Sequence, residues 1–66
     1  MNNIIKIILY NNERIVITSY NKLLEISSEI IKIDDFLIIG ENLKIKKMDS
    51  YMIELIGEVE EVKNEE

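Results

Sequence analysis

The sequence predicts an all-β fold, in which about six or seven short strands form an antiparallel meander as a small sandwich or a curved sheet. Three observations support this prediction. A short segment with apolar residues two positions apart recurs along the chain, and this spacing places both side chains on one face of a strand. Isoleucine and valine fill most of the apolar positions, and β-branched side chains favour a pleated sheet over a helix. Polar links rich in Asn, Asp and Ser separate the copies.

The links between the copies set the order of the strands. Residues 11–12, an Asn pair, suit a tight hairpin because asparagine tolerates positive φ better than other non-glycine residues. Residues 27–28 and 34–35 mark further turns, and Gly40 opens another link. Such short connections require consecutive strands to run antiparallel. The expected strands are 3–10, 13–19, 22–27, 29–33, 36–39, 42–47 and 51–62.

The alternation of polar and apolar residues assigns the side chains to two faces. The side chains expected to face water are Glu25, Lys32, Lys44, Lys46 and Glu54. The side chains expected to face the core are Leu24, Ile26, Ile31, Ile33, Leu37, Ile39, Leu43, Ile45, Ile53 and Leu55. Strands 3–10 and 36–39 are apolar on both faces, so each is expected to be central or covered by another chain.

A short β-solenoid-like stack is the alternative fold, because the apolar residues Ile31, Leu37 and Leu43 are spaced by six. A step of seven precedes this run and a step of ten follows it. These unequal steps favour the meander.

The chain is expected to form one small domain, residues 1–62, followed by an acidic disordered tail at 63–66. A chain of 66 residues buries only about 60% of the surface that its unfolded form exposes. Small domains usually compensate with disulfides, a structural metal or a partner. The sequence contains no Cys and no His, which excludes disulfides and structural zinc. We therefore expect a homo-oligomer or a subunit of a complex.

No residue pattern indicates an enzyme, a metal site or a cofactor. Nucleophilic catalysis needs an activating base, usually His, beside Ser or Cys, and the serines of this chain lack one. The only adjacent aspartate pair, residues 34–35, lies at an expected turn. The sequence also has no calcium-binding loop and no glycine-rich phosphate loop. We expect a protein without catalytic residues.

The charge pattern argues against a strong interaction with nucleic acid, which requires clustered Lys and Arg. The net charge is −5, and residues 58–66 carry five carboxylates against Lys63 alone. Lys44, Lys46 and Lys47 form one local basic cluster, interpreted as the solvated face of a strand. No secretory signal and no apolar run of the roughly 18–20 residues that cross a bilayer is evident. We expect a cytosolic protein, or one held at a membrane by a partner.

Two apolar strands and the aromatic residues indicate where a partner would bind. Exposed sheet edges invite strand addition, and Tyr is favoured at contact surfaces. The candidate interface residues are Ile5, Ile8, Tyr10, Phe36, Ile38 and Tyr51. The alternative function is a small ligand-binding or nucleic-acid-binding β domain.

Residues 15–62 resemble the YabP/YqfC family of sporulation proteins of endospore-forming Firmicutes. The resemblance rests on four segments: Arg14–Ile17, Leu23–Ile26, Phe36–Met48 and Ile53–Val62. Phe36–Met48 looks like the apolar strand, glycine, polar link and "Leu-x-Ile" strand of that family. Relatives commonly carry a second glycine near residues 34–35, which is absent here, and a tighter hairpin accounts for the difference. The short chain and compact link look more like the YqfC branch.

This resemblance implies a protein made in the mother cell during spore formation, without known enzymatic activity. For the YqfC branch it implies a membrane-bound sporulation protein as the partner. The chain itself would then lie in the mother-cell cytoplasm or peripherally at the forespore-facing membrane, without entering the bilayer.

Overall fold

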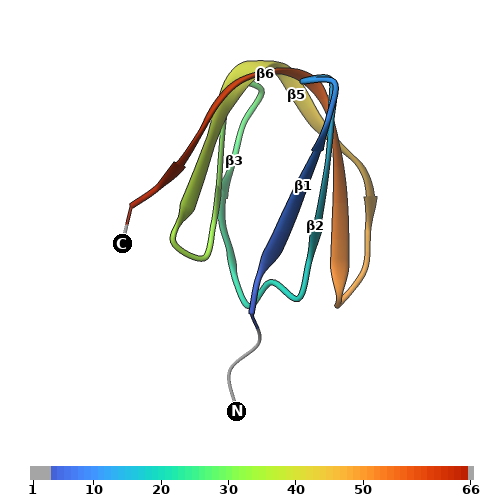
Figure 1. Cartoon of the computed structure of the whole chain (residues 1–66), viewed down its shortest axis with the longest axis vertical. Helices are drawn as coiled ribbons and strands as arrows, with labels where there is room; N and C mark the ends of the chain where they lie inside the picture. The colour runs from blue at the N-terminus through green and yellow to red at the C-terminus, as the bar shows by residue number, and fades with distance from the viewer. Residues whose placement is uncertain (1–3, 66) are drawn as a thin grey trace.

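The computed structural model describes residues 4–65, and within that range the chain forms six β-strands and no helix. The strands are β1 (Lys6–Tyr10), β2 (Arg14–Thr18), β3 (Leu23–Ile26), β4 (Ile30–Ile33), β5 (Phe36–Met48) and β6 (Met52–Asn64). The prediction of an all-β antiparallel fold is confirmed (Figure 1). The expected segments 36–39 and 42–47 are one strand, β5, which continues through bulges instead of a turn. β6 continues past the expected end at 62, whereas residues 3 and 66 lie outside the described residues.

The six strands form one sheet in the order β1-β2-β6-β5-β4-β3. Four of the five strand pairs join neighbours in the sequence, as in a meander, and the fifth joins β2 to β6. The link after β2 therefore leads to β3 at the far edge of the sheet. β1 and β3 are the two outermost strands.

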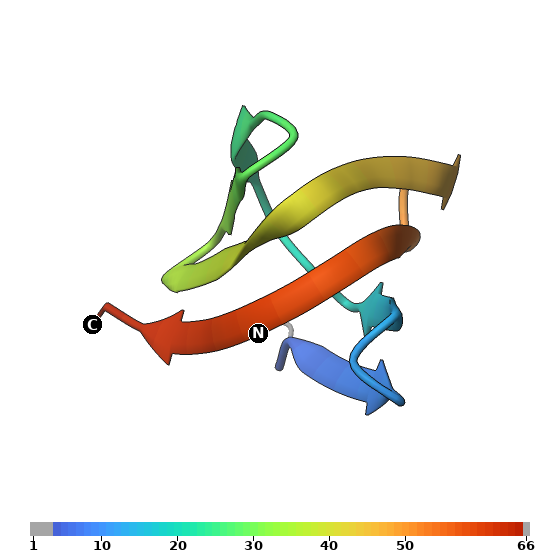
Figure 2. The same ribbon diagram turned by 90° about the horizontal axis from the view of Figure 1, so that it is seen from above.

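The long hairpin of β5 and β6 bends in the middle and folds the sheet into two layers (Figures 1 and 2). The first layer contains β1, β2, residues 52–56 of β6 and residues 44–48 of β5. The second layer contains β3, β4, residues 36–40 of β5 and residues 59–64 of β6. Each long strand thus contributes one half to each layer, and the single open sheet folds over as a small two-layered sandwich.

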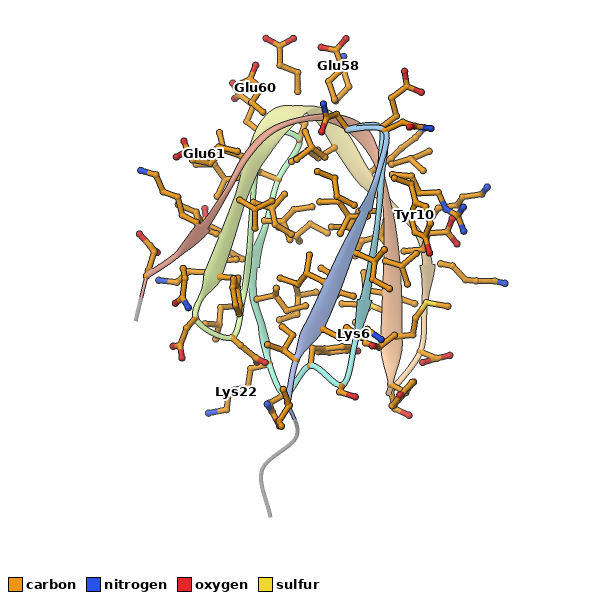
Figure 3. The ribbon with its side chains drawn as sticks, in the orientation of Figure 1. Lys6, Tyr10, Lys22, Glu58, Glu60 and Glu61 are labelled. Carbon is orange, nitrogen blue, oxygen red and sulfur yellow. The ribbon has the colours of Figure 1, made fainter. Side chains whose placement is uncertain are left out.

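Two glycines make this bend possible because the backbones of β5 and β6 approach closely there. A Cβ atom on Gly40 would lie 2.0 Å from the carbonyl oxygen of Glu58. A Cβ atom on Gly57 would lie 2.6 Å from the carbonyl oxygen of Asn42, and Gly57 has a φ of +137°. Other residues rarely adopt that φ. Glu58 marks the bend at the top of the molecule in Figure 3.

Matching backbone hydrogen bonds tie the bend to the two short hairpins. The N–H of Gly40 donates to the carbonyl of Glu29 in the β3–β4 loop at 3.0 Å. The N–H of Gly57 donates to the carbonyl of Glu13 in the β1–β2 loop at 3.1 Å. The strand pairing and these bonds together relate the two layers by an approximate two-fold arrangement.

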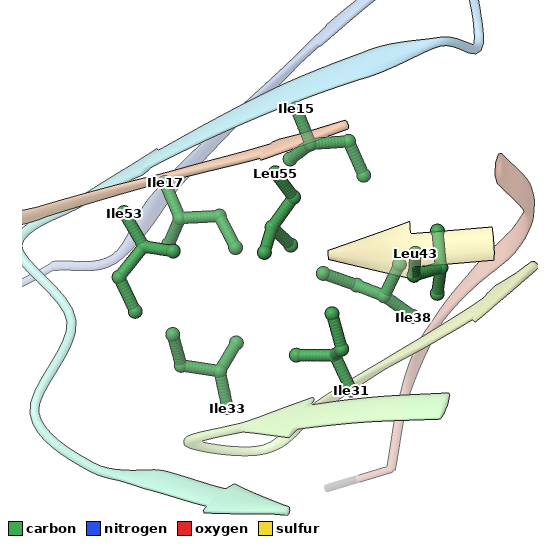
Figure 4. Packing of buried hydrophobic residues seen from close by; sticks show 8 residues of the cluster. All are labelled: Ile15, Ile17, Ile31, Ile33, Ile38, Leu43, Ile53 and Leu55. Atoms are coloured by element: carbon green, nitrogen blue, oxygen red, sulfur yellow. The ribbon is translucent and has the colours of Figure 1, made fainter. Parts of the chain in front are cut away.

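The core lies between the two layers and is built from branched aliphatic side chains (Figure 4). Its buried members are Ile15, Ile17, Ile31, Ile33, Ile38, Leu43, Ile53 and Leu55. Full burial of one such side chain contributes about 1.5–3 kcal/mol to stability. The core is therefore small, as expected for a chain of this length, and depends on nearly every member.

The predicted faces are correct for most strands and wrong for the first half of β5. Leu37 and Ile39, expected in the core, are half-exposed, and Ile38 between them is fully buried. The register of β5 against β6 shifts at Gly40 and again before Lys44. Only the second shift adds a residue to β5, which advances three residues from Glu41 to Lys44 while β6 advances two. This extra residue reverses the alternation of faces along β5, so the pattern of residues 43–45 does not extend back to residues 37–39.

The edge strand β3 departs from the prediction in a different way. Leu24 and Ile26 were expected in the core but are 55% and 48% exposed. β3 has a neighbour on one side only, and its register against β4 shifts between Leu23 and Glu25. An edge position leaves side chains uncovered even when their alternation is that of a buried strand.

Asparagine and aspartate make the tight turns, as the sequence predicts. Asn11 and Asn12 have φ values of 55° and 59°, and the N–H of Glu13 donates to the carbonyl of Tyr10 at 3.2 Å. Asp34 has a φ of 52°, and its carboxylate accepts the N–H of Lys22 at 2.7 Å. The turn between β4 and β5 is thereby hydrogen-bonded to the long link between β2 and β3.

Asp49 organises the turn between β5 and β6, and this role predicts a pH dependence. Its Oδ1 accepts the N–H groups of Tyr51 and Met52, each at 2.8 Å. These bonds hold the pKa of Asp49 below its ordinary value of 3.8. A carboxyl with a depressed pKa in the folded state stabilises the fold above its unfolded pKa, and this contribution disappears as the pH falls through the folded value.

We expect the wild-type protein to lose more stability than Asp49→Asn when the pH falls from 5 to 2. The variant keeps an oxygen at the turn but has no carboxylate to protonate. Urea unfolding followed by circular dichroism at several pH values measures the difference. An identical pH dependence in the two proteins would contradict the assignment.

Candidate interaction edges

The structure does not bring the six predicted interface residues together. Ile5 packs against the core, whereas Ile8 lies half-exposed on the outer face of the first layer, paired with Val16. Tyr10, at the end of β1, is 42% exposed. The first strand therefore offers only part of its length to a partner.

The other three predicted residues lie elsewhere. Phe36 is half-buried against the core, and Ile38 is fully buried within it. The placement of Ile38 at an interface is therefore corrected: the extra residue of β5 between Glu41 and Lys44 puts Ile38 on the core face. Tyr51 is 61% exposed in the turn between β5 and β6.

An ion pair, missed from the sequence, occupies the outer face of the first layer. Arg14 Nε donates to Glu54 Oε2 at 2.5 Å, and its guanidinium carbon lies 4.8 Å from the centre of the Tyr10 ring. Glu54 was expected to face water but is only 7% exposed. Its register partners Val16 and Lys47 flank it on both sides, because β6 is a central strand of this layer.

Both flanks of the sandwich are open. The first layer ends at β1 and at residues 44–48 of β5, and the second ends at β3 and at the second half of β6. Figure 2 shows β1 and the end of β6 along one flank, with β3 and the end of β5 along the other. Among residues 4–65 no strand bridges the two layers at either flank.

Four exposed apolar side chains border these flanks, and all four share a face with the core. Cross-strand partners in a sheet point to the same face. Leu9 is paired with Ile15, Val62 with Ile38, Ile26 with Ile31 and Met48 with Ile53. Each of these partners is at most 1% exposed, whereas Leu9, Val62, Ile26 and Met48 are 43%, 37%, 48% and 49% exposed. The inner face of the sandwich thus continues to solvent at both flanks.

Sequence reasoning could not identify these flanks because the alternation of Leu9 or Ile26 is the same as that of a buried residue. Only the strand order shows which residues lie at an edge. The pairing of β2 with β6, between residues far apart in the sequence, fixes that order.

Within residues 4–65 no group of three or more Asp or Glu side chains is placed to hold a metal ion. The same residues contain no helix that is long and apolar enough to cross a membrane.

No protein-family model matches the chain, and neither a curated protein nor a solved structure matches it.

Proposed function

We propose that this chain is a non-enzymatic interaction module whose open flanks are covered by a neighbouring protein. One observation carries the proposal: Leu9, Val62, Ile26 and Met48 point to the same face as the core yet remain 37–49% exposed. Apolar residues scattered over a surface need no explanation. These four side chains instead continue the core face along two strand edges, where a bound partner would bury them.

Such a partner would add substantially to the stability of a chain of this size. Covering a half-exposed Leu, Ile or Met contributes about 1 kcal/mol, because full burial contributes about 1.5–3 kcal/mol. The edge strands also carry backbone groups that an added strand would pair. A small domain has a total stability of only a few kcal/mol, so two covered flanks would change it markedly.

For the cellular role, we propose a place in spore formation, which the resemblance to the YabP/YqfC family supports. The chain would act in the mother cell and bind a membrane-bound sporulation protein, remaining itself outside the bilayer. Deletion of its gene is expected to lower the yield of heat-resistant spores. An unchanged yield would contradict this role and would leave the proposal of an interaction module in place.

Site-specific photocrosslinking tests the interaction module directly. A photoreactive phenylalanine analogue replaces Leu9 on one flank, Met48 on the other, or the exposed Glu13 of the β1–β2 turn as a control. The two flank positions are expected to give discrete protein adducts in cells that make the protein, and the control is not. A folded protein without adducts at either flank would overturn the proposal.

A further inference from the structure

We propose that copies of this chain join by pairing the basic free edge of β5 in one copy with the acidic free edge of β6 in the next. This inference rests on the proposed interaction function and names both the surfaces and the partner. The basic edge is defined as residues 44–48, and the acidic edge as residues 58–63.

Each of these edges has a neighbouring strand on one side only. Residues 44–48 pair with β6, while β4 pairs only with residues 36–39 of β5. Residues 61–63 pair with β5, while β2 pairs only with residues 52–56 of β6. Backbone bonds from the hairpin loops reach Leu43, just before the basic edge, and Val59, near the beginning of the acidic edge. Among residues 4–65 no strand pairs with either edge beyond these two residues on its free side. Both edges can therefore accept an added strand.

The charges on the two edges are opposite. Lys44, Lys46 and Lys47 of the basic edge are all exposed. The acidic edge carries the exposed residues Glu58, Glu60 and Glu61 against Lys63, and Figure 3 shows the three glutamates gathered at the bend and along one side of the molecule. Directly opposed like charges destabilise a strand pair, and opposite charges stabilise it. Two basic edges or two acidic edges therefore repel, and only the unlike pair is favoured.

The two edges also carry apolar side chains that point to the same, inner face of the sheet. Ile45 and Met48 of the basic edge pair with Leu55 and Ile53 of the core, and they point to the inner face. Val62 of the acidic edge pairs with the buried Ile38 and points the same way. Joining the edges would continue the sheet from one copy to the next and extend the inner face across the junction.

The outermost strands β1 and β3 do not carry clusters of opposite charge. β1 carries a single lysine, Lys6, and β3 a single glutamate, Glu25. The pronounced charge difference is confined to the two edges made by the long bent hairpin.

The proposed contact is heterologous, because it joins two different surfaces. After every addition, the growing assembly still has one free basic edge at one end and one free acidic edge at the other. Such contacts build chains or closed rings rather than an isolated two-fold dimer. We therefore expect assemblies larger than a dimer, with a mean size that rises with protein concentration.

A charge-swap experiment tests the inference. One variant, Lys44→Glu with Lys46→Glu, has two acidic edges, and the other, Glu60→Lys with Glu61→Lys, has two basic edges. Each variant alone is expected to associate at least about tenfold more weakly than the wild type, because attraction between opposed strands becomes repulsion. An equal mixture of the two is expected to associate again. Sedimentation velocity measures the assemblies, and circular dichroism confirms the strand content of each variant.

Control variants distinguish an effect of the edge charges from an effect of the net charge. Lys6→Glu with Lys22→Glu changes the net charge as much as the first variant, at exposed positions outside the basic edge, and is expected to assemble as the wild type does (Figure 3). A monomeric wild type, unchanged assembly of the two swapped variants, or a mixture that stays monomeric would each overturn the inference. Flank crosslinks to a different protein alone would also overturn it while supporting the proposed function.

A second measurement serves where a swapped variant does not fold. The chain has no native cysteine, so Lys46→Cys in one preparation and Glu61→Cys in another provide single thiols. Mixed disulfides are expected to form about tenfold faster or more than disulfides within either preparation, because pairing raises the effective concentration of the two thiols. Equal rates would overturn the inference.

Discussion

Gly57→Ala is expected to lower the free energy of unfolding by about 3 kcal/mol or more, through backbone strain together with a steric clash. Gly57 has a φ of +137°, and an added Cβ would lie 2.6 Å from the carbonyl oxygen of Asn42. The obstacle is backbone, so no side chain can rotate away from it. Because a chain of this size is stabilised by roughly 3–10 kcal/mol, the variant should be largely unfolded or close to it.

Gly40→Ala should behave similarly for a related reason. Its Cβ would lie 2.0 Å from the carbonyl oxygen of Glu58, so β5 and β6 would have to move apart at the bend. Urea unfolding followed by circular dichroism measures both variants, with Ser50→Ala in the exposed β5–β6 turn as the control. A loss below about 0.5 kcal/mol in either glycine variant, which is typical of a neutral surface change, would show that the bend does not need glycine.

The second large effect is expected in the core. Ile17→Ala should cost about 2–5 kcal/mol, through lost burial and the cavity that remains, whereas Ile17→Val should cost about 0.5–1.5 kcal/mol. Ile17 is fully buried, and its register partner Ile53 is 1% exposed, so few neighbours are free to fill the space. The same urea experiment provides the measurement.

A matched control exists at the beginning of the described chain. Ile4 is 87% exposed, and Ile4→Ala is expected to change stability by less than about 0.5 kcal/mol. Equal losses for Ile4→Ala and Ile17→Ala would contradict the assignment of Ile17 to the core.

Local chemistry in the sequence is sufficient to predict the strands and turns. The Asn pair at residues 11–12 forms a turn with positive φ at both positions, as expected from the tolerance of asparagine. The period-two alternation assigns Ile31, Ile33, Ile53 and Leu55 to the core correctly. These features depend on residues within a few positions of one another, so a single sequence contains them.

Features that depend on distant pairing were not predictable in this way. The burial of Glu54 follows from the central position of β6 between β2 and β5, which no local pattern specifies. The inward position of Ile38 follows from register shifts in β5. Gly40 was expected to mark a turn, and its actual role, the close approach of two backbones, becomes visible only when Glu58 is placed beside it.

The sequence predicted an interaction through strand edges, and that interaction stays a prediction. The structure has free strand edges, but their positions were not predictable. However, the predicted residues are spread over the first strand, the core and a turn, and the open flanks are bordered by other residues. The lysines at 44, 46 and 47 were interpreted as a solvated strand face, because the acidic edge that complements them belongs to a different strand.

Sedimentation of the unmodified chain over a range of protein and salt concentrations is the most direct test of the account. At low salt we expect assemblies that grow with protein concentration, and we expect added salt to weaken them, since salt screens exposed charges. A folded chain that stays monomeric at low salt and at the highest attainable concentration would contradict the central claim that the basic edge of one copy pairs with the acidic edge of the next.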